Sequence, residues 1–140
     1  MRSSRPILLV EDDNVDVMTV RRAFKDLRVM NELVPTGDGE AALDYLRSRG
    51  KLRPCVILLD LNMPRMSGTE FLKIIKADET LKTIPVVVMT SSNTEQDITK
   101  SFELGAAGYM VKSVDYDKFI ETIKTIDSYW TLSKLPPNGE

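Results

Sequence analysis

Residues 7–13 have the sequence Ile-Leu-Leu-Val-Glu-Asp-Asp, and this stretch decides the fold. Its first half, Ile7–Val10, is a short continuous apolar run, which is typical of a strand buried on both faces. Three acids end the run, and Asp13-Asn14 offers side chains that favour the start of a helix. A buried strand that leads through an acidic loop into a helix is a building unit of an α/β fold.

The same pattern recurs along the rest of the chain, with turn residues between each apolar run and a segment of helical spacing. The predicted strands cover residues 7–10, 33–34, 56–59, 85–89 and 108–111. The apolar positions of the predicted helices are Val15, Met18, Phe24 and Leu27, then Ala41, Ala42, Leu43 and Leu46, then Phe71, Leu72, Ile75 and Leu81, then Ile98, Phe102 and Leu104 within 95–104, and finally Phe119, Ile123, Ile126 and Trp130.

Five strands that alternate with five helices predict a doubly wound α/β fold, with helices on both faces of a parallel sheet. Pro35 lacks the backbone N–H that an interior strand needs, so we place the second strand at an edge. The expected strand order is therefore 2-1-3-4-5.

The composition is that of one ordinary globular domain of 140 residues. We expect this domain to span residues 1–131, and residues 132–140 to form a tail that is flexible or associated with a dimer. The net charge of −2 gives no electrostatic reason to expect nucleic acid or a membrane as a partner. Since no apolar run is long enough for a signal peptide or a membrane span, we expect a cytoplasmic location.

Histidine is absent from the sequence, which excludes histidine-based catalysis and histidine-bound zinc. The single cysteine, Cys55, excludes an internal disulfide and is expected to be a small buried hydrophobic residue. Any chemistry must use carboxylates, lysine and hydroxyls, with or without a hard cation.

Polar groups from distant parts of the sequence are expected to converge at one edge of the sheet. In a doubly wound sheet, functional groups lie at the carboxyl ends of the strands, where the strand order reverses. The groups that converge there are the acids Glu11, Asp12 and Asp60, the hydroxyl of Thr90 and the ammonium of Lys112. Asp13 is assigned to the helix cap instead.

Three carboxylates at close quarters repel one another unless a cation relieves the repulsion. Mg²⁺ fits best, because it prefers few protein ligands, keeps waters and bridges to phosphate oxygens. A carboxylate nucleophile beside Mg²⁺, with a lysine and a hydroxyl nearby, is equipped for in-line phosphoryl transfer that forms an acyl phosphate.

The ordered motifs resemble the receiver domains of two-component response regulators, which have a flavodoxin-like, or CheY-like, (βα)5 fold. The matching segments are residues 7–13, Leu-Leu-Asp-Leu-Asn-Met-Pro at 58–64 with Gly68, Val-Met-Thr-Ser at 88–91 and Gly-Tyr-Met-Val-Lys at 108–112. Each motif alone is weak, but their combination spans essentially the whole chain and is specific.

The resemblance implies that a sensor histidine kinase phosphorylates Asp60, and that the chain signals through protein contacts without an output domain of its own. It implies these further roles: Glu11 (through water), Asp12, Asp60 and the Asn62 carbonyl for Mg²⁺, Lys112 and Thr90 for the phosphoryl group, Thr90 and Tyr109 for switching, and Asn62 and Ser92 for the rate of hydrolysis.

One position departs from the family pattern. Receiver domains usually have proline in a cis bond after the lysine, whereas Ser113 follows Lys112 here. A cis bond without proline costs about 3 kcal/mol, so the resemblance leaves this bond open. The Lys-Ser pair, the Asn-Met-Pro segment and the aromatic final helix are similar to single-domain regulators paired with bacterial phytochrome kinases, which makes such a kinase the expected partner.

Each site residue also has a simpler interpretation. The acids of residues 11–13 could cap a helix, Thr90 could be a strand residue, and Lys112 could be a solvated surface lysine. Their shared position at the strand ends favours the site. For Tyr109 a core role and a switching role are compatible, and both stay open.

The end of the last helix carries Tyr129 and Trp130, followed by two leucines. These residues either fold back on their own domain or, as we favour, form part of a self-complementary dimer surface with the last strand and helix.

Two other functions fit the sequence less well than the phosphorylation switch. An aspartyl phosphatase would need a second acid two residues after its nucleophile, where this chain has Asn62. A nucleotide- or flavin-binding module would need a glycine-rich loop after the first strand, which is missing.

Overall fold

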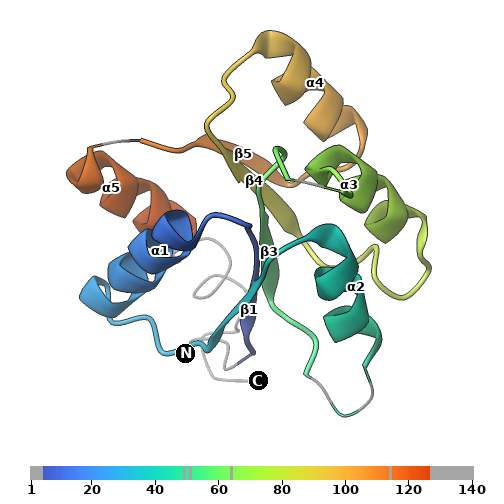
Figure 1. Cartoon of the computed structure of the whole chain (residues 1–140), viewed down its shortest axis with the longest axis horizontal. Coiled ribbons are helices and arrows are strands. Elements are labelled where there is room, and N and C mark those ends of the chain that lie inside the picture. The colour runs from blue at the N-terminus through green and yellow to red at the C-terminus, as the bar shows by residue number, and fades with distance from the viewer. Residues whose placement is uncertain (1–4, 49, 51, 64, 114, 127–140) are drawn as a thin grey trace, which may run out of the picture.

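Five parallel strands form the centre of the computed structural model, in the order β2-β1-β3-β4-β5 (Figure 1). The strands are β1 (Ile7–Val10), β2 (Leu33–Thr36), β3 (Val56–Leu59), β4 (Val86–Thr90) and β5 (Gly108–Val111). The helices are α1 (Asn14–Asp26), α2 (Gly39–Arg47), α3 (Gly68–Ala77), α4 (Glu95–Glu103) and α5 (Tyr116–Ile126). The structure describes residues 5–48, 50, 52–63, 65–113 and 115–126. The predicted fold class and strand order are confirmed.

Helices cover both faces of the sheet, with α1 and α5 on one side and α2 and α3 on the other (Figure 1). Alternate strand residues point to opposite faces. In β1, Ile7 and Leu9 join the core beneath α1 and α5, whereas Leu8 and Val10 join the core beneath α2 and α3. The central strands β1, β3 and β4 are buried along their whole length, because each has an apolar layer on both sides.

Helix starts follow the capping residues of the sequence. Asp13 is the N-cap of α1, and its carboxylate accepts hydrogen bonds from the backbone N–H groups of Val15 and Asp16. Ser67 and Glu70 form a capping box at the start of α3. These caps set where the chain turns after β1 and β3, and so position the loops that carry the acids.

The expected apolar face of α1 is partly wrong. Val15 and Met18 are each 68% exposed, whereas Phe24 is buried and Leu27 is partly buried, as predicted, and Val20 and Ala23 complete the buried face. The buried residues share one helical face at i, i+3 and i+4, whereas Val15 and Met18 lie on another face. Two apolar faces competed in the sequence, and packing against α5 selected one.

Smaller differences concern the ends of elements. Strand β2 runs on through Pro35 to Thr36, because Leu9 and Val10 of β1 pair with these two residues at the sheet edge. Strand β4 begins at Val86, one residue later than predicted. Leu81 is buried but lies beyond the end of α3, and Phe102 of α4 is 49% exposed.

Candidate functional site

The carboxyl ends of β1 and β3 lie side by side at the predicted edge of the sheet. Val10 and Leu59 are register partners, and the backbone N–H of Asp60 donates to the Val10 carbonyl at 3.0 Å. The residues that follow the two strands therefore meet. One carboxylate oxygen from each of Glu11, Asp12 and Asp60 lies within 4.8 Å of the others.

Two of the three acids in this cluster are buried, which makes their negative charges unfavourable. Glu11 is 4% exposed and Asp60 is 6% exposed, whereas Asp12 is exposed. Burial raises the pKa of Glu11 from 4.5 to about 7, and the charge of Asp60 adds to the rise, while Lys112 opposes it. Three clustered carboxylates offer only oxygen donors, which is the ligand set of a hard divalent cation. The acidic cluster is consistent with a divalent metal site.

The ammonium of Lys112 enters this cluster from the end of β5. Its Nζ lies 2.5 Å from Glu11 Oε1, 2.8 Å from Asp16 Oδ2 and 3.5 Å from Asp60 Oδ2. Burial by itself lowers the pKa of Lys112, but the hydrogen bonds to Asp16 and Glu11 outweigh it, so the pKa lies above its ordinary value. Lys112 is therefore a fixed positive charge beside Asp60.

Asp16 is a site residue that the sequence analysis did not predict. It lies in the first turn of α1, three residues after the N-cap Asp13. The only feature of the sequence that could have indicated it is its position in the first turn of the helix that follows β1, just after the acids of residues 11–13. An acid there also looks like an ordinary favourable charge at a helix N-terminus, so its pairing with Lys112 could not be predicted.

Thr90 is linked to Asp60 through Asn62. Thr90 is fully buried at the end of β4, and its Oγ1 lies 3.4 Å from Asn62 Nδ2. The backbone N–H of Asn62 donates to Asp60 Oδ1 at 3.2 Å, which holds that carboxylate from the β3–α3 loop. One oxygen of the Asp60 carboxylate thus accepts from a backbone amide, and the other lies near the Lys112 ammonium.

Tyr109 of β5 is half-buried, and its hydroxyl donates to the Ser92 carbonyl at 2.8 Å. The pKa of Tyr109 is raised above its ordinary value, and burial is the main cause. Ser92 in turn donates its hydroxyl to Asp97 in the first turn of α4. Tyr109 packs against the core beneath α2 and α3, so the core role is present, and its hydroxyl also binds the loop that follows Thr90.

The bond between Lys112 and Ser113 is trans, since no cis peptide bond occurs among the described residues. The Ser113 hydroxyl accepts a hydrogen bond from the backbone N–H of Asp115 at 3.1 Å. Cys55 is 4% exposed, as expected for a small core residue. The suggested interface residues Tyr129 and Trp130, and the 132–140 tail, lie outside the described residues.

The fold and the site together define a class of protein. A flavodoxin-like sheet carries an acidic trio at its switch point, with a lysine and a threonine from the two neighbouring strand ends. None of the helices in the described part of the chain has the length and apolar character needed to cross a bilayer.

Comparison with known proteins identifies the family. The response regulator receiver domain matches residues 7–124. Response regulator Rcp1 of Synechocystis is 40% identical over 128 residues, which cover 89% of this chain and 87% of Rcp1. A probable methanogenesis regulatory protein, FilR2 of Methanothrix harundinacea, is 39% identical over 127 residues, covering 89% of this chain and 82% of FilR2.

Solved structures agree with this assignment. The phosphorylated cyanobacterial phytochrome response regulator RcpA superimposes with a TM-score of 0.85 at 39% identity, covering 96% of this chain and 98% of RcpA. The bacteriophytochrome response regulator AtBRR has a TM-score of 0.76 at 40% identity, covering 93% and 97%. The Mn²⁺-bound form of Rcp1 has a TM-score of 0.83 at 38% identity, covering 92% and 96%. The chain belongs to the response regulator receiver family and is a two-component signalling protein.

Proposed function

We propose that Asp60 accepts a phosphoryl group from a sensor histidine kinase with the help of Mg²⁺. The observation that carries the proposal is the position of Asp60, which is 6% exposed at the end of β3 and lies 3.5 Å from the Lys112 ammonium. Asp60 is one of the three clustered acids, and its carboxylate also lies beside the positive charge of Lys112.

The transfer would begin with attack of an Asp60 carboxylate oxygen on phosphorus. A new O–P bond forms while the P–N bond to the kinase's phosphohistidine breaks, and the imidazole leaves with the bonding electron pair. Negative charge on the equatorial oxygens is stabilised by the Lys112 ammonium and by the hydroxyl of Thr90. The product is an aspartyl phosphate.

Glu11, Asp12, Asp60 and the backbone carbonyl of Asn62 would hold the metal ion, with Glu11 acting through water. Mg²⁺ would neutralise charge on the phosphoryl oxygens, and the all-oxygen donor set supports a hard cation of this kind. Asn62 and Ser92 would tune the rate at which water removes the phosphoryl group, a reaction that the chain's own site would assist.

Signalling would pass from Thr90 to Tyr109. Movement of the Thr90 hydroxyl toward the phosphoryl group shifts the loop that holds Ser92, and this loop holds the Tyr109 hydroxyl. The changed surface would then be read by a downstream protein. The switch is proposed to be the receiver domain of residues 1–131, acting in the cytoplasm. Tyr129 and Trp130 are proposed to form part of a homodimer surface, and residues 132–140 to be a tail that is flexible or associated with the dimer.

The partner kinase is proposed to be of the phytochrome type, because the similar proteins RcpA and AtBRR are a phytochrome response regulator and a bacteriophytochrome response regulator. Incubation with an autophosphorylated bacterial phytochrome kinase is expected to move the phosphoryl group to this chain within seconds, because cognate pairs dock before transfer. A histidine kinase from an unrelated system is the control. Equal transfer rates from both kinases would contradict the partner assignment.

The stability of the metal-free protein and its affinity for Mg²⁺ should change with pH in opposite directions. Because the Glu11 carboxyl has a pKa near 7 in the metal-free fold and 4.5 as its ordinary value, the fold binds the extra proton between these values. The free energy of unfolding in EDTA should therefore fall as pH rises from 5 toward 7.5. Over the same range the affinity for Mg²⁺ should rise, because a proton no longer competes for Glu11.

Thermal unfolding and Mg²⁺ titration at several pH values measure both trends. Glu11→Gln is the matched control, since its amide does not titrate and the substitution should remove the contribution of Glu11 to both pH dependences.

Acetyl phosphate should modify the wild type with Mg²⁺ and leave it unmodified in EDTA. Identical pH profiles for wild type and Glu11→Gln, or full modification in EDTA, would contradict the assigned metal site.

A further inference from the structure

The ion pair between Asp16 and Lys112 reaches beyond the acceptor cluster. Asp16 Oδ2 accepts a hydrogen bond from Lys112 Nζ at 2.8 Å, across 96 residues of sequence. The same ammonium lies 3.5 Å from Asp60 Oδ2, which is beyond the length of a strong charge-assisted hydrogen bond. Lys112 is therefore held more closely by α1 than by the carboxylate that it would serve.

We propose that Asp16 is a positioning residue that competes with the phosphoryl group on Asp60 for the Lys112 ammonium. This inference rests on the proposed function of Asp60. A lysine ammonium has three N–H donors, and Glu11 and Asp16 each accept one at short distance here. A phosphoryl group brings up to about two negative charges and three acceptor oxygens, so it draws the ammonium toward Asp60.

The geometry explains why Asp16 is the contact that resists this movement. Glu11 follows β1 and stands beside Asp60, so Lys112 can approach Asp60 and keep Glu11. Asp16 belongs to α1 and lies outside the acidic trio. The side chain of Asp16 is 37% exposed, so water can replace Lys112 when the pair opens, and the pair restrains the lysine without locking it.

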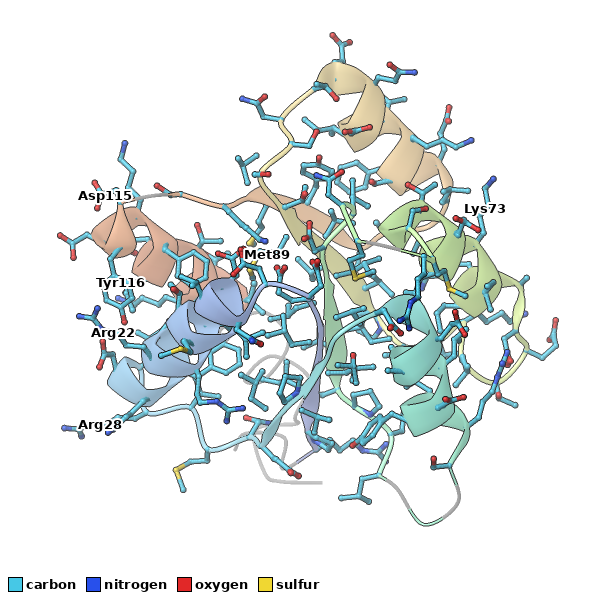
Figure 2. The ribbon with its side chains drawn as sticks, in the orientation of Figure 1. Arg22, Arg28, Lys73, Met89, Asp115 and Tyr116 are labelled. Atoms are coloured by element: carbon cyan, nitrogen blue, oxygen red, sulfur yellow. The ribbon has the colours of Figure 1, made fainter. Side chains whose placement is uncertain are left out.

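Space for the rearrangement exists next to the pair. A cavity of about 510 Å³ is lined by Asp16 and Lys112, and Met89, Tyr116 and Phe119 also line it. Figure 2 labels Met89 at the sheet and Tyr116 on α5, with α1 beside them. Because Asp16 borders this open space, its carboxylate can be hydrated there when Lys112 moves toward Asp60.

The test measures the affinity of beryllofluoride, an analogue of the phosphoryl group, for the Mg²⁺-saturated full chain. Fluorine NMR is suitable because it measures weak as well as tight binding. Asp16→Asn should bind beryllofluoride about fivefold more tightly than wild type, as expected for loss of one partly exposed ion pair. Asp16→Glu should return the affinity toward wild type, and Asp44→Asn, a charge-matched change on the exposed side of α2, should leave it unchanged.

A Lys112→Gln background separates positioning from a general effect of charge. If Asp16 acts through Lys112, Asp16→Asn should have no effect in that background. A fivefold gain that persists there would overturn the proposal, as would equal or weaker binding by Asp16→Asn alone. If folded wild type binds no beryllofluoride, the proposed function of Asp60 fails; if wild type binds and Asp16→Asn shows no gain, this inference alone fails.

Discussion

Asp60→Asn is expected to abolish phosphorylation by acetyl phosphate, with a loss of at least about a thousandfold in rate, because an amide is no nucleophile toward phosphorus. The substitution keeps the side-chain shape, so the sheet and the neighbouring contacts should persist. Wild type and variant would be compared by intact mass after incubation with acetyl phosphate and Mg²⁺. Asp44→Asn serves as the control for loss of one carboxylate on the exposed surface.

The position of the modification can be tested separately from its presence. An aspartyl phosphate is reduced by borohydride to homoserine, which peptide mass spectrometry locates. We expect homoserine at position 60 and aspartate at position 12, because the Asp60 carboxylate lies between Lys112 and Asn62. Label at Asp12, or persistent stoichiometric labelling of Asp60→Asn, would remove the assignment of the acceptor.

Gly68→Ala should destabilise the fold and disturb the site together. A Cβ at Gly68 would lie 2.4 Å from the Asp60 carbonyl oxygen and 2.6 Å from Leu61 Cα. Both atoms are backbone, so the start of α3 and the end of β3 must move apart. We expect a loss of about 2–3 kcal/mol in the free energy of unfolding, as for an overpacked core, and a fall in Tm of about 10 °C.

The same displacement should slow modification of Asp60, since the Gly68 N–H also donates to the Leu61 carbonyl and ties the loop to α3. Gly37→Ala is the matched control, because a Cβ there meets no atom within 4 Å. Thermal unfolding and the acetyl phosphate rate would be measured on both variants. Equal stability of the two would show that α3 does not press on the acceptor loop.

The general architecture was predictable because its signals are local. Buried strands such as Ile7–Val10 and Val56–Leu59 appear as continuous apolar runs, and Asp13 marks a helix start by its side-chain chemistry. Pro35 placed β2 at the edge because it lacks a backbone donor. The meeting of Glu11 with Asp60 followed from topology alone, since adjacent parallel strands end at the same edge.

Prediction from the sequence failed where two local patterns competed. The apolar residues of α1 offered more than one helical face, and Val15 and Met18 were placed on the wrong one. Periodicity states that a helix has an apolar face but not which face meets its neighbour. Packing against α5 and the sheet made that choice, because it buries Val20, Ala23 and Phe24 together.

The sequence by itself determined the order of strands and helices, the edge of the sheet where the acids gather and the residue types available there. Tertiary structure alone decided which partners those side chains take: Lys112 with Asp16 as well as Glu11, and Tyr109 with the Ser92 carbonyl. Hydrophobic period and capping are properties of neighbouring residues. These contacts join residues that are between 17 and 101 positions apart, and only the packing of helices and sheet brings such residues together.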